Sequence, residues 1–352
     1  MPNIQGRAKF LLVLLFVVST FSFFERKPIH AFASINSSKA ECVMEKESRR
    51  ILYESNGDTR LPMASTTKIA TAITVLEECS DLEKKFVIPS IAIGIEGSSI
   101  YLKEGDSYSS LDLLHGLMLR SGNDAATALA IHTSKTIERF CVKMNKIAQK
   151  AGAFHTNFKN PHGLPVVGHY STARDLSYIT CYALHNATFE KIVSTKYYKP
   201  FNWINKNKIL RQYPYSIGVK TGYTKEAGRC LVSAAKKEEM TLVCTVLSCA
   251  DMYNRSIALF DECFKRYKMT QLLNKNDVFN LECNGITVPC SAGRNFSYPL
   301  LEEEGDYIEI ITTTNQDINK IGHFEGKKEE IYGKIEIYLL KRLIFSSNLY
   351  KL

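Results

Sequence analysis

The sequence lacks the short cysteine and histidine patterns that mark structural metal sites. None of its ten cysteines is followed by a second one three positions later, and no cysteine–histidine cluster has zinc spacing. A chain of 352 residues can bury a core without cross-links. We therefore expect most cysteines to be small buried apolar residues, and neither a metal nor an organic cofactor is implied. An even cysteine count still permits disulfides in an exported protein, and Cys283 with Cys290 is the first pair to test.

Runs of basic residues, internal repeats and low-complexity tracts are also missing. The formal net charge is +9, but the charge is spread along the chain. No nucleic-acid site is indicated, because such sites gather their basic residues on one face or in one run. A mildly basic exported protein can still favour an anionic envelope surface, so peripheral membrane contact stays open.

The apolar segment near the N-terminus, residues 10–24, falls short of the roughly 20 residues that a membrane-spanning helix needs. Two basic residues precede it, and an Ala-x-Ala pattern ends at Ala33. This order is typical of a secretory signal. The charged residues 25–27 fit that pattern poorly, so an uncleaved anchor is the alternative. We predict a signal peptide over 1–33 and an extracytoplasmic protein of the cell envelope or the medium.

The remaining chain has a helix-rich block followed by a strand-rich block. We expect a two-stranded hairpin within 40–54, helices over 65–78, 111–120, 124–133 and 137–152, another helix start at 171–176, strands over 216–224, 230–235 and 240–249, and a helix over 253–267. Because strands and helices are segregated rather than alternating, the pattern predicts an α+β fold and not a doubly wound sheet.

From about residue 271 the pattern changes to short strand-like runs such as 307–311 and 334–339. We therefore predict a small β-rich C-terminal domain over 271–352 after a catalytic domain over 34–270. The residues that follow the run 334–339 include an apolar patch, but the stretch is too short to predict an interfacial helix. Membrane attachment through this end stays open.

A serine and a lysine stand three positions apart at the start of an apolar segment. On a helix, Ser65 and Lys68 share one face, with their Cβ atoms about 5–6 Å apart. A serine hydroxyl needs a base within hydrogen-bonding reach, and a lysine kept neutral by burial or a nearby cation can be that base. Taken alone, however, the pattern favours a helix-capping serine beside a solvated lysine.

Two further motifs change this interpretation. Residues 121–123 (Ser-Gly-Asn) lie at an expected loop-to-helix junction, and residues 220–222 (Lys-Thr-Gly) lie on an expected strand. Each could be ordinary by itself, as a helix cap and as a strand that ends in a glycine turn. Three motifs in this order, each in a matching structural context, favour a functional site.

With these motifs, the chain resembles the penicillin-recognising serine D,D-peptidases, specifically the low-molecular-mass D-alanyl-D-alanine carboxypeptidases. The similarity runs from about residue 40 to 267 and more loosely beyond; its blocks are 61–72, 96–130, 160–164, 169–176 and 218–235. The resemblance implies an antiparallel sheet flanked by helices, with an all-helical subdomain. It also implies peptidoglycan stem peptides as substrates and β-lactams as covalent inhibitors.

The resemblance assigns catalytic roles to the first two motifs. Ser65 would attack the carbonyl of the penultimate D-alanine, and Lys68 would accept its proton. Ser121 would relay a proton to the leaving amine. Asn123 would hold the substrate amide and Lys68 in place.

The resemblance assigns substrate binding to the third motif and its neighbours. Lys220 would supply positive charge near the terminal carboxylate, and Thr221 would bond to that carboxylate. Gly222 would leave the strand edge open, and the backbone N–H of Tyr223 would complete an oxyanion hole with that of Ser65. Arg255 resembles the family's second carboxylate-binding cation, although a surface arginine is almost as good an interpretation.

Three other polar residues are better interpreted as structural. His162 and His169 flank a turn, but the implied chemistry needs no imidazole. Asp175 fits a helix-capping acid better than a catalyst.

Two other functions stay open. A serine β-lactamase shares the first and third motifs but needs a glutamate on a later loop to activate the deacylating water. Residues 139–189 contain no glutamate, so we expect a long-lived penicillin acyl-enzyme. The second alternative is a non-catalytic envelope protein that binds peptidoglycan or β-lactams.

Overall fold

The computed structural model describes residues 38–283, 285–315, 321–324 and 327–352. The predicted signal peptide and its cleavage after Ala33 lie outside these residues. Within the described part, every helix is too short or too polar to cross a lipid bilayer.

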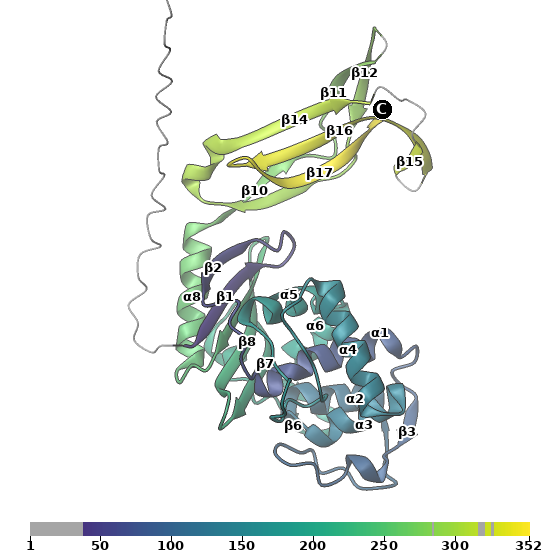
Figure 1. Cartoon of the computed structure of the whole chain (residues 1–352), viewed down its shortest axis with the longest axis vertical. Helices are drawn as coiled ribbons and strands as arrows, with labels where there is room; N and C mark the ends of the chain where they lie inside the picture. Colours follow the sequence, from purple (N-terminus) through teal and green to yellow (C-terminus); the bar gives the residue numbers. More distant parts are fainter. Residues whose placement is uncertain (1–37, 284, 316–320, 325–326) are drawn as a thin grey trace, which may run out of the picture. The chain divides into compact units, whose positions relative to one another are not determined.

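A five-stranded antiparallel sheet in the order β2-β1-β9-β8-β7 organises the first part of the fold (Figure 1). Its strands are β1 (Ala40–Glu45), β2 (Ile51–Ser55), β7 (Ser216–Thr224), β8 (Gly228–Lys237) and β9 (Met240–Leu247). Pairing of β1 with β9 joins the start of this part to its last strand. β7 is an edge strand, so one side of its backbone is open to an added strand.

Helices cover both faces of the sheet. α8 (Met252–Arg266) packs on β8 and β9, and α5 (Ala173–Ala183) packs on β1 and β9 from the opposite side (Figure 1). The other helices are α1 (Lys68–Glu78), α2 (Ser110–His115), α3 (Asn123–Ser134), α4 (Ile137–Ala151), α6 (Ala187–Ser194) and α7 (Ile209–Gln212). The short elements are β3 (Lys85–Val87), β4 (Ser107–Ser109), β5 (Tyr197–Tyr198), β6 (Trp203–Ile204) and the 3₁₀ turns Ser90–Ala92 and Lys199–Phe201.

α1 lies at the centre of the helical cluster. It packs against α3, α4 and α5, and its residues from Lys68 to Val75 are all buried. A single 3₁₀ turn, η1 (Ala64–Thr67), leads into it. Its small and apolar side chains make α1 a rigid support for the groups at its N-terminus.

The predicted α+β class is confirmed, and the predicted helices and strands of this part lie within a few residues of the observed ones. The expected helix over 111–120 differs in its second half. There it becomes a π-helical turn, η3 (Gly116–Arg120), which ends at Ser121 in the left-handed conformation with φ 66. Such a widened turn re-aims the residues that follow it, and π-helical turns are frequent at functional sites.

Strands that follow α8 form a separate sheet in the order β11-β12-β17-β16-β14, with β15 paired to β16. The strands of this part are β10 (Lys268–Leu273), β11 (Phe279–Cys283), β12 (Ile286–Ser291), β13 (Phe296–Leu300), β14 (Ile308–Thr314), β15 (Ile321–Phe324), β16 (Lys327–Leu339) and β17 (Arg342–Lys351), and a 3₁₀ turn covers Glu302–Tyr307. β10 pairs with β13 in a sheet of two strands.

A further strand, β17, follows the strand-like run 334–339 and pairs with β16 along most of its length. Leu340 and Lys341 make the reversal with positive φ values of 49 and 65. Hairpin turns of this kind usually carry glycine or asparagine. Because neither residue type stands here, this turn has no signature in the sequence.

The expectation that most cysteines are buried is confirmed, and the pair selected for testing, Cys283 with Cys290, is not cross-linked. All ten are free, and all except Cys79 are buried. Cys283 and Cys290 lie on the paired strands β11 and β12, but they are not opposite each other. Cys283 faces Ile286, and Cys290 faces Phe279.

Candidate active site

Ser65 and Lys68 meet where η1 passes into α1. The Nζ atom of Lys68 lies 2.9 Å from the Oγ atom of Ser65. Lys68 is completely buried. Burial, reinforced by the charge of Lys220, holds the pKa of Lys68 well below its usual value. The pair therefore has the geometry and the electrostatics of a hydroxyl beside a neutral amine.

Two further contacts fix the direction of the Lys68 amine. Its Nζ donates to Oδ1 of Asn123 and to the backbone carbonyl of His162, both at 2.6 Å. A neutral amine has two N–H donors and one lone pair. With both donors used in this way, the lone pair faces Ser65. The Asn123 amide is oriented in turn by donating to the carbonyl of Glu96.

Ser121 is placed by the π-helical turn η3. Its left-handed backbone is rare for a residue with a side chain, and such strain is found at functional sites. Ser121 is nearly buried, yet it lines the same cavity as Ser65. The structure thus brings the serine of the second motif to the nucleophile, although 56 positions separate them in the chain.

The third motif lies on the edge strand β7. Lys220 is 1% exposed, and burial together with the charge of Lys206 lowers its pKa to about 7. Its Nζ donates to the backbone carbonyl of Thr221 at 2.8 Å. Thr221, Gly222 and Tyr223 line the cavity beside Ser65.

Gly222 permits β7 to approach the nucleophile. A Cβ atom at this position would lie 3.0 Å from the carbonyl oxygen of Met63 and 3.1 Å from the backbone nitrogens of Ser65 and Thr66. These distances are shorter than nearly all real Cβ contacts. Only glycine therefore lets the strand lie against η1 without displacement.

The cavity between these elements has a volume of about 540 Å³. Its lining residues are Ser65, Ser98, Ser121, Lys206, Thr221, Gly222, Tyr223, Arg229, Met252 and Tyr253. Two of them are cations and none carries a carboxylate. The chemistry of the cavity therefore suits an anionic ligand next to an activated hydroxyl.

Sequence reasoning missed several of these contributors. Lys206 and Arg229 supply the cationic lining, while the backbone carbonyls of Glu96 and His162 orient Asn123 and Lys68. A backbone carbonyl has no residue-type signature, so no sequence pattern reveals its role. Arg229 stands nine positions after Lys220 on the next strand, which was the available signal.

Arg255 does not line the cavity. Its guanidinium makes a bidentate ion pair with Glu41, with distances of 2.7 and 2.6 Å, and it also donates to the hydroxyl of Tyr53. Glu41 is 3% exposed, and Arg255 neutralises the charge of its carboxylate. The structure therefore gives Arg255 a structural ion pair in place of the carboxylate-binding position expected for it.

The two histidines that flank the turn are structural; His169 is buried and His162 is partly buried. Burial lowers the pKa of His162 to about 3 and that of His169 to about 4, so both imidazoles are neutral near pH 7. His169 accepts the N–H of Lys159 at Nδ1, which leaves Nε2 to donate to the hydroxyl of Thr67. The loop is pressed against η1, because a Cβ on Gly163 would overlap the carbonyl of Ala64.

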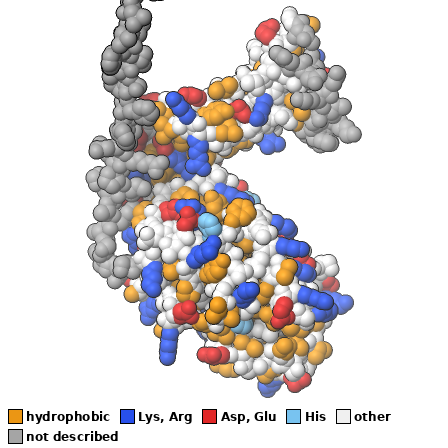
Figure 2. Space-filling model, in the orientation of Figure 1, with side chains coloured by type: hydrophobic (Ala, Val, Ile, Leu, Met, Phe, Trp, Pro, Cys, Tyr) orange, Lys and Arg blue, Asp and Glu red, His pale blue; other side chains and the backbone are white. Residues whose placement is uncertain are grey.

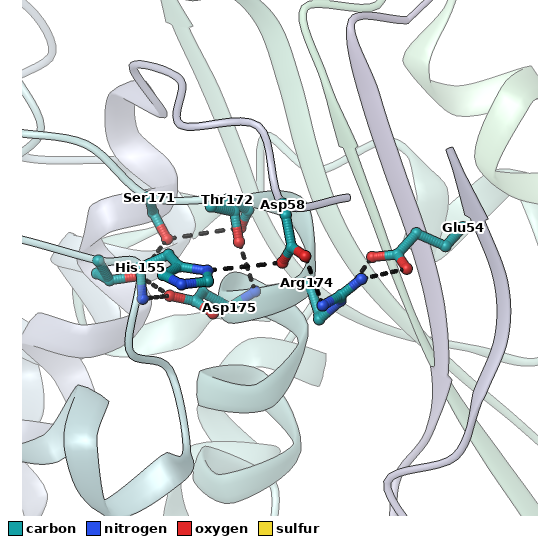
Figure 3. Close-up of polar contacts among 8 residues, drawn as sticks. Glu54, Asp58, His155, Ser171, Thr172, Arg174 and Asp175 are labelled. Carbon is teal, nitrogen blue, oxygen red and sulfur yellow. Dashed lines mark hydrogen bonds and ion pairs between the residues drawn. The ribbon is translucent and has the colours of Figure 1, made fainter. Parts of the chain in front are cut away.

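A polar cluster joins the start of α5 to the segment that leads to the nucleophile (Figure 3). Arg174 binds both oxygens of Glu54 and reaches Asp58. Backbone hydrogen bonds in both directions connect Leu61 with Ser171. The cluster therefore fixes the chain only a few residues before Ser65.

Asp175 belongs to the same cluster but is not the reciprocal cap that its spacing suggested. Thr172 does cap the helix, since its hydroxyl accepts the N–H of Asp175. The carboxylate of Asp175 instead accepts the N–H of His155 and the hydroxyl of Thr156 (Figure 3). It thus connects α5 to the loop that precedes the turn at 160–164.

Comparison with known proteins agrees with this geometry. The family model of D-alanyl-D-alanine carboxypeptidases, Peptidase S11, matches residues 28–251. The chain is 30% identical to D-alanyl-D-alanine carboxypeptidase DacF of Bacillus subtilis, over 93% of its own length and 85% of that protein. It is 34% identical to DacC of Escherichia coli, over 60% of this chain and 56% of that one.

Solved structures give the same result. Penicillin binding protein 5 from Haemophilus influenzae superposes with a TM-score of 0.76 at 25% identity, covering 90% of this chain and 97% of that one. The DD-transpeptidase of Streptomyces K15, as its S216A mutant, superposes with a TM-score of 0.61 at 33% identity, over 65% and 98% of the two chains. This chain therefore belongs to the peptidase S11 family of D-alanyl-D-alanine carboxypeptidases.

Proposed function

We propose that this enzyme is a serine D,D-carboxypeptidase that removes the terminal D-alanine from peptidoglycan stem pentapeptides. The observation that carries the proposal is the buried Lys68 amine, 2.9 Å from Ser65, with its other sides occupied by an amide and a carbonyl oxygen. Such an amine can take the hydroxyl proton without first losing one to solvent.

Acylation follows from these contacts. The Oγ atom of Ser65 attacks the carbonyl of the penultimate D-alanine while its proton passes to Lys68. The backbone N–H groups of Ser65 and Tyr223 stabilise the oxyanion. The C–N bond then breaks, the leaving D-alanine amine takes a proton through Ser121, and an ester on Ser65 remains. Water hydrolyses that ester and regenerates the hydroxyl.

Binding of the peptide uses the open edge of β7. A peptide laid along this edge is held by main-chain hydrogen bonds, as in other cases of strand addition. In this orientation Thr221 would bond to the terminal carboxylate, the buried Lys220 would supply positive charge near it, and Asn123 would hold both the substrate amide and Lys68. The cationic lining of the cavity supports this orientation.

Release of D-alanine from a stem pentapeptide by the purified full chain tests the proposal, with Ser65→Ala as the control. We expect the wild type to release D-alanine and Ser65→Ala to release none. A fluorescent penicillin followed by mass spectrometry should add one label to the wild type only. Labelling of Ser65→Ala would show that another residue is the nucleophile.

Experiments on the same two proteins also distinguish the peptidase from the two alternatives, a serine β-lactamase and a non-catalytic binding protein. Residues 139–189 offer no glutamate to activate a deacylating water, so the penicillin ester should be long-lived. Rapid turnover of benzylpenicillin would instead favour a β-lactamase. Labelling by penicillin without any release of D-alanine would favour a binding protein with no peptidase activity.

We further propose that the enzyme is exported and acts outside the cytoplasm. Basic and acidic side chains are intermixed on the face shown in Figure 2, so this face offers no single-sign patch for anionic lipids. Fractionation of cells that express the chain with and without residues 1–33 tests export and attachment together.

The division into a catalytic part over 34–270 and a β-rich part over 271–352 is also proposed. One face of the five-stranded sheet and the helices from α1 to α6 enclose one apolar core. The sheet that contains β16 encloses another, built around Leu281, Ile335 and Ile337. Two cores with no shared residue support two folding units.

A further inference from the structure

The cavity contains a cation to which no function has yet been assigned. Arg229 is the second residue of β8 and lines the cavity together with Thr221 and Tyr223. Its guanidinium donates a 3.3 Å hydrogen bond to the carbonyl of Ala250, and it forms no ion pair with any acid in the described part of the chain. The arginine is therefore oriented by a backbone carbonyl while its remaining donors stay available.

Strand register places Arg229 beside the substrate-binding motif. Tyr223 pairs directly with Arg229, and Thr221 pairs with Leu231, without a bulge between these positions. Directly opposed residues of antiparallel strands point to the same face, so Thr221, Tyr223 and Arg229 share one face of the sheet. Thr221 and Arg229 are diagonal neighbours, roughly 7–8 Å apart, which an arginine side chain can span.

The oxyanion hole fixes where a terminal carboxylate must lie. The scissile carbonyl would lie at the N–H groups of Ser65 and Tyr223, and only one D-alanine residue follows it. One residue extends about 3.5 Å. The carboxylate therefore has to be close to the face that carries Thr221 and Arg229.

Among the other cations, Lys220 is buried outside the cavity lining, and its amine donates to the carbonyl of Thr221, so it supplies charge rather than a direct contact. The remaining two are also less suited to this position. Arg255 is committed to Glu41, and breaking a buried pair of this kind leaves an uncompensated charge. The backbone N–H of Lys206 bonds to the carbonyl of Leu119, which places Lys206 next to the turn that ends at Ser121. That is the side of the cavity where the leaving amine is protonated.

We propose that Arg229, together with Thr221, binds the free α-carboxylate of the substrate and makes the enzyme selective for peptides with an unblocked C-terminus. A planar guanidinium can hold a carboxylate through two parallel hydrogen bonds, which a lysine cannot. The inference rests on the proposed peptidase function and adds the residue that selects the substrate class. The carboxylate of a penicillin would occupy the same position.

The test compares two stem pentapeptides that differ only at the C-terminus, one with a free acid and one with an amide. For Arg229→Gln we expect kcat/KM on the free acid to fall about 10- to 100-fold, as for loss of a charge-assisted hydrogen bond. The value on the amide should stay near that of the wild type. For Arg229→Lys, kcat/KM on the free acid should lie between the values of the wild type and of Arg229→Gln, because lysine keeps the charge but lacks the planar guanidinium.

Lys225→Gln is the matched control, since it removes one positive charge from the same hairpin at an exposed position outside the cavity lining. It should leave the acid-to-amide ratio unchanged. An unchanged ratio in Arg229→Gln would overturn the inference, whether both rates fall or neither does. Thermal unfolding of each variant confirms that it is folded.

Acylation by benzylpenicillin and by its methyl ester, followed by mass spectrometry, keeps the two proposals separable. Arg229→Gln should slow acylation by the acid by a similar factor and leave the ester unaffected. If the wild type released no D-alanine but this difference appeared, the peptidase function would fail and the role of Arg229 would stand. Equal effects on acid and ester would overturn the role of Arg229 alone.

Discussion

At the scale of single residues, the proposed mechanism requires opposite protonation states of two buried lysines. Lys68 acts as a base only when neutral, and burial with the nearby charge of Lys220 lowers its pKa. Lys220 attracts a carboxylate only when charged, although burial lowers its pKa to about 7. Each lysine therefore limits activity on a different side of the pH optimum.

We expect the second-order rate of acylation by penicillin to be bell-shaped in pH. The rate should rise as Lys68 loses its proton. It should fall above about pH 7 as Lys220 of the unliganded enzyme loses its charge. Lys220→Arg should move the falling limb to higher pH, because arginine stays charged. Stopped-flow measurement across pH 5 to 10 on both proteins, with roughly constant ionic strength, checks this. An identical falling limb in both would assign it to another group.

Gly222 gives a steric prediction at the same scale. In Gly222→Ala the new Cβ meets backbone atoms of Met63, Ser65 and Thr66, which cannot rotate away as a side chain could. We expect β7 to shift from η1, lowering the acylation rate about 10- to 100-fold, with a loss of about 1–3 kcal/mol in the free energy of unfolding. Gly305→Ala is the control, since a Cβ atom at that position would have no neighbouring atom within 4 Å. Equal rates in both variants would contradict the argument.

At the scale of elements, the helix that follows Ser65 and the strand that carries Lys220 were predictable because their signals are local. Periodicity marks α1 and β7, and each motif lies within a few consecutive residues. What could not be predicted depends on where distant elements meet. The register of β8 brings Arg229 to the cavity, and the pairing of β1 with its neighbours brings Glu41 to Arg255. Neither contact has a pattern within a single stretch of sequence.

The ionic cluster at the start of α5 should stabilise the segment that leads to Ser65. Arg174→Gln removes both bonds to Glu54 and the contact with Asp58. These groups are partly exposed, so we expect a loss of about 1–2 kcal/mol in the free energy of unfolding, reduced at high salt. Chemical denaturation measures it. Adding Glu54→Gln should cost less in the variant than in the wild type, because the partner charge is already gone. Full additivity of the two substitutions would show that the pair is not coupled.

At the scale of the whole molecule, the two apolar cores share no residue. The contacts that connect them include Arg50, which donates to the carbonyl of Pro299, pairs with Glu304 and lies over the rings of Tyr267 and Tyr298. Polar contacts of this kind carry far less free energy than a shared apolar core would. The two units should therefore unfold separately.

Calorimetry of the full chain should show two transitions, and acylation with benzylpenicillin should raise only one of them. The acyl group contacts the cavity of the catalytic part, so it stabilises the unit that contains Ser65 and leaves the β-rich unit unaffected. In Ser65→Ala, the same antibiotic should leave the temperatures of both transitions unchanged. Arg50→Gln should not raise the temperature of either transition, since the substitution only removes contacts between the two units. A single transition that penicillin moves as a whole would mean that the two cores unfold as one cooperative unit.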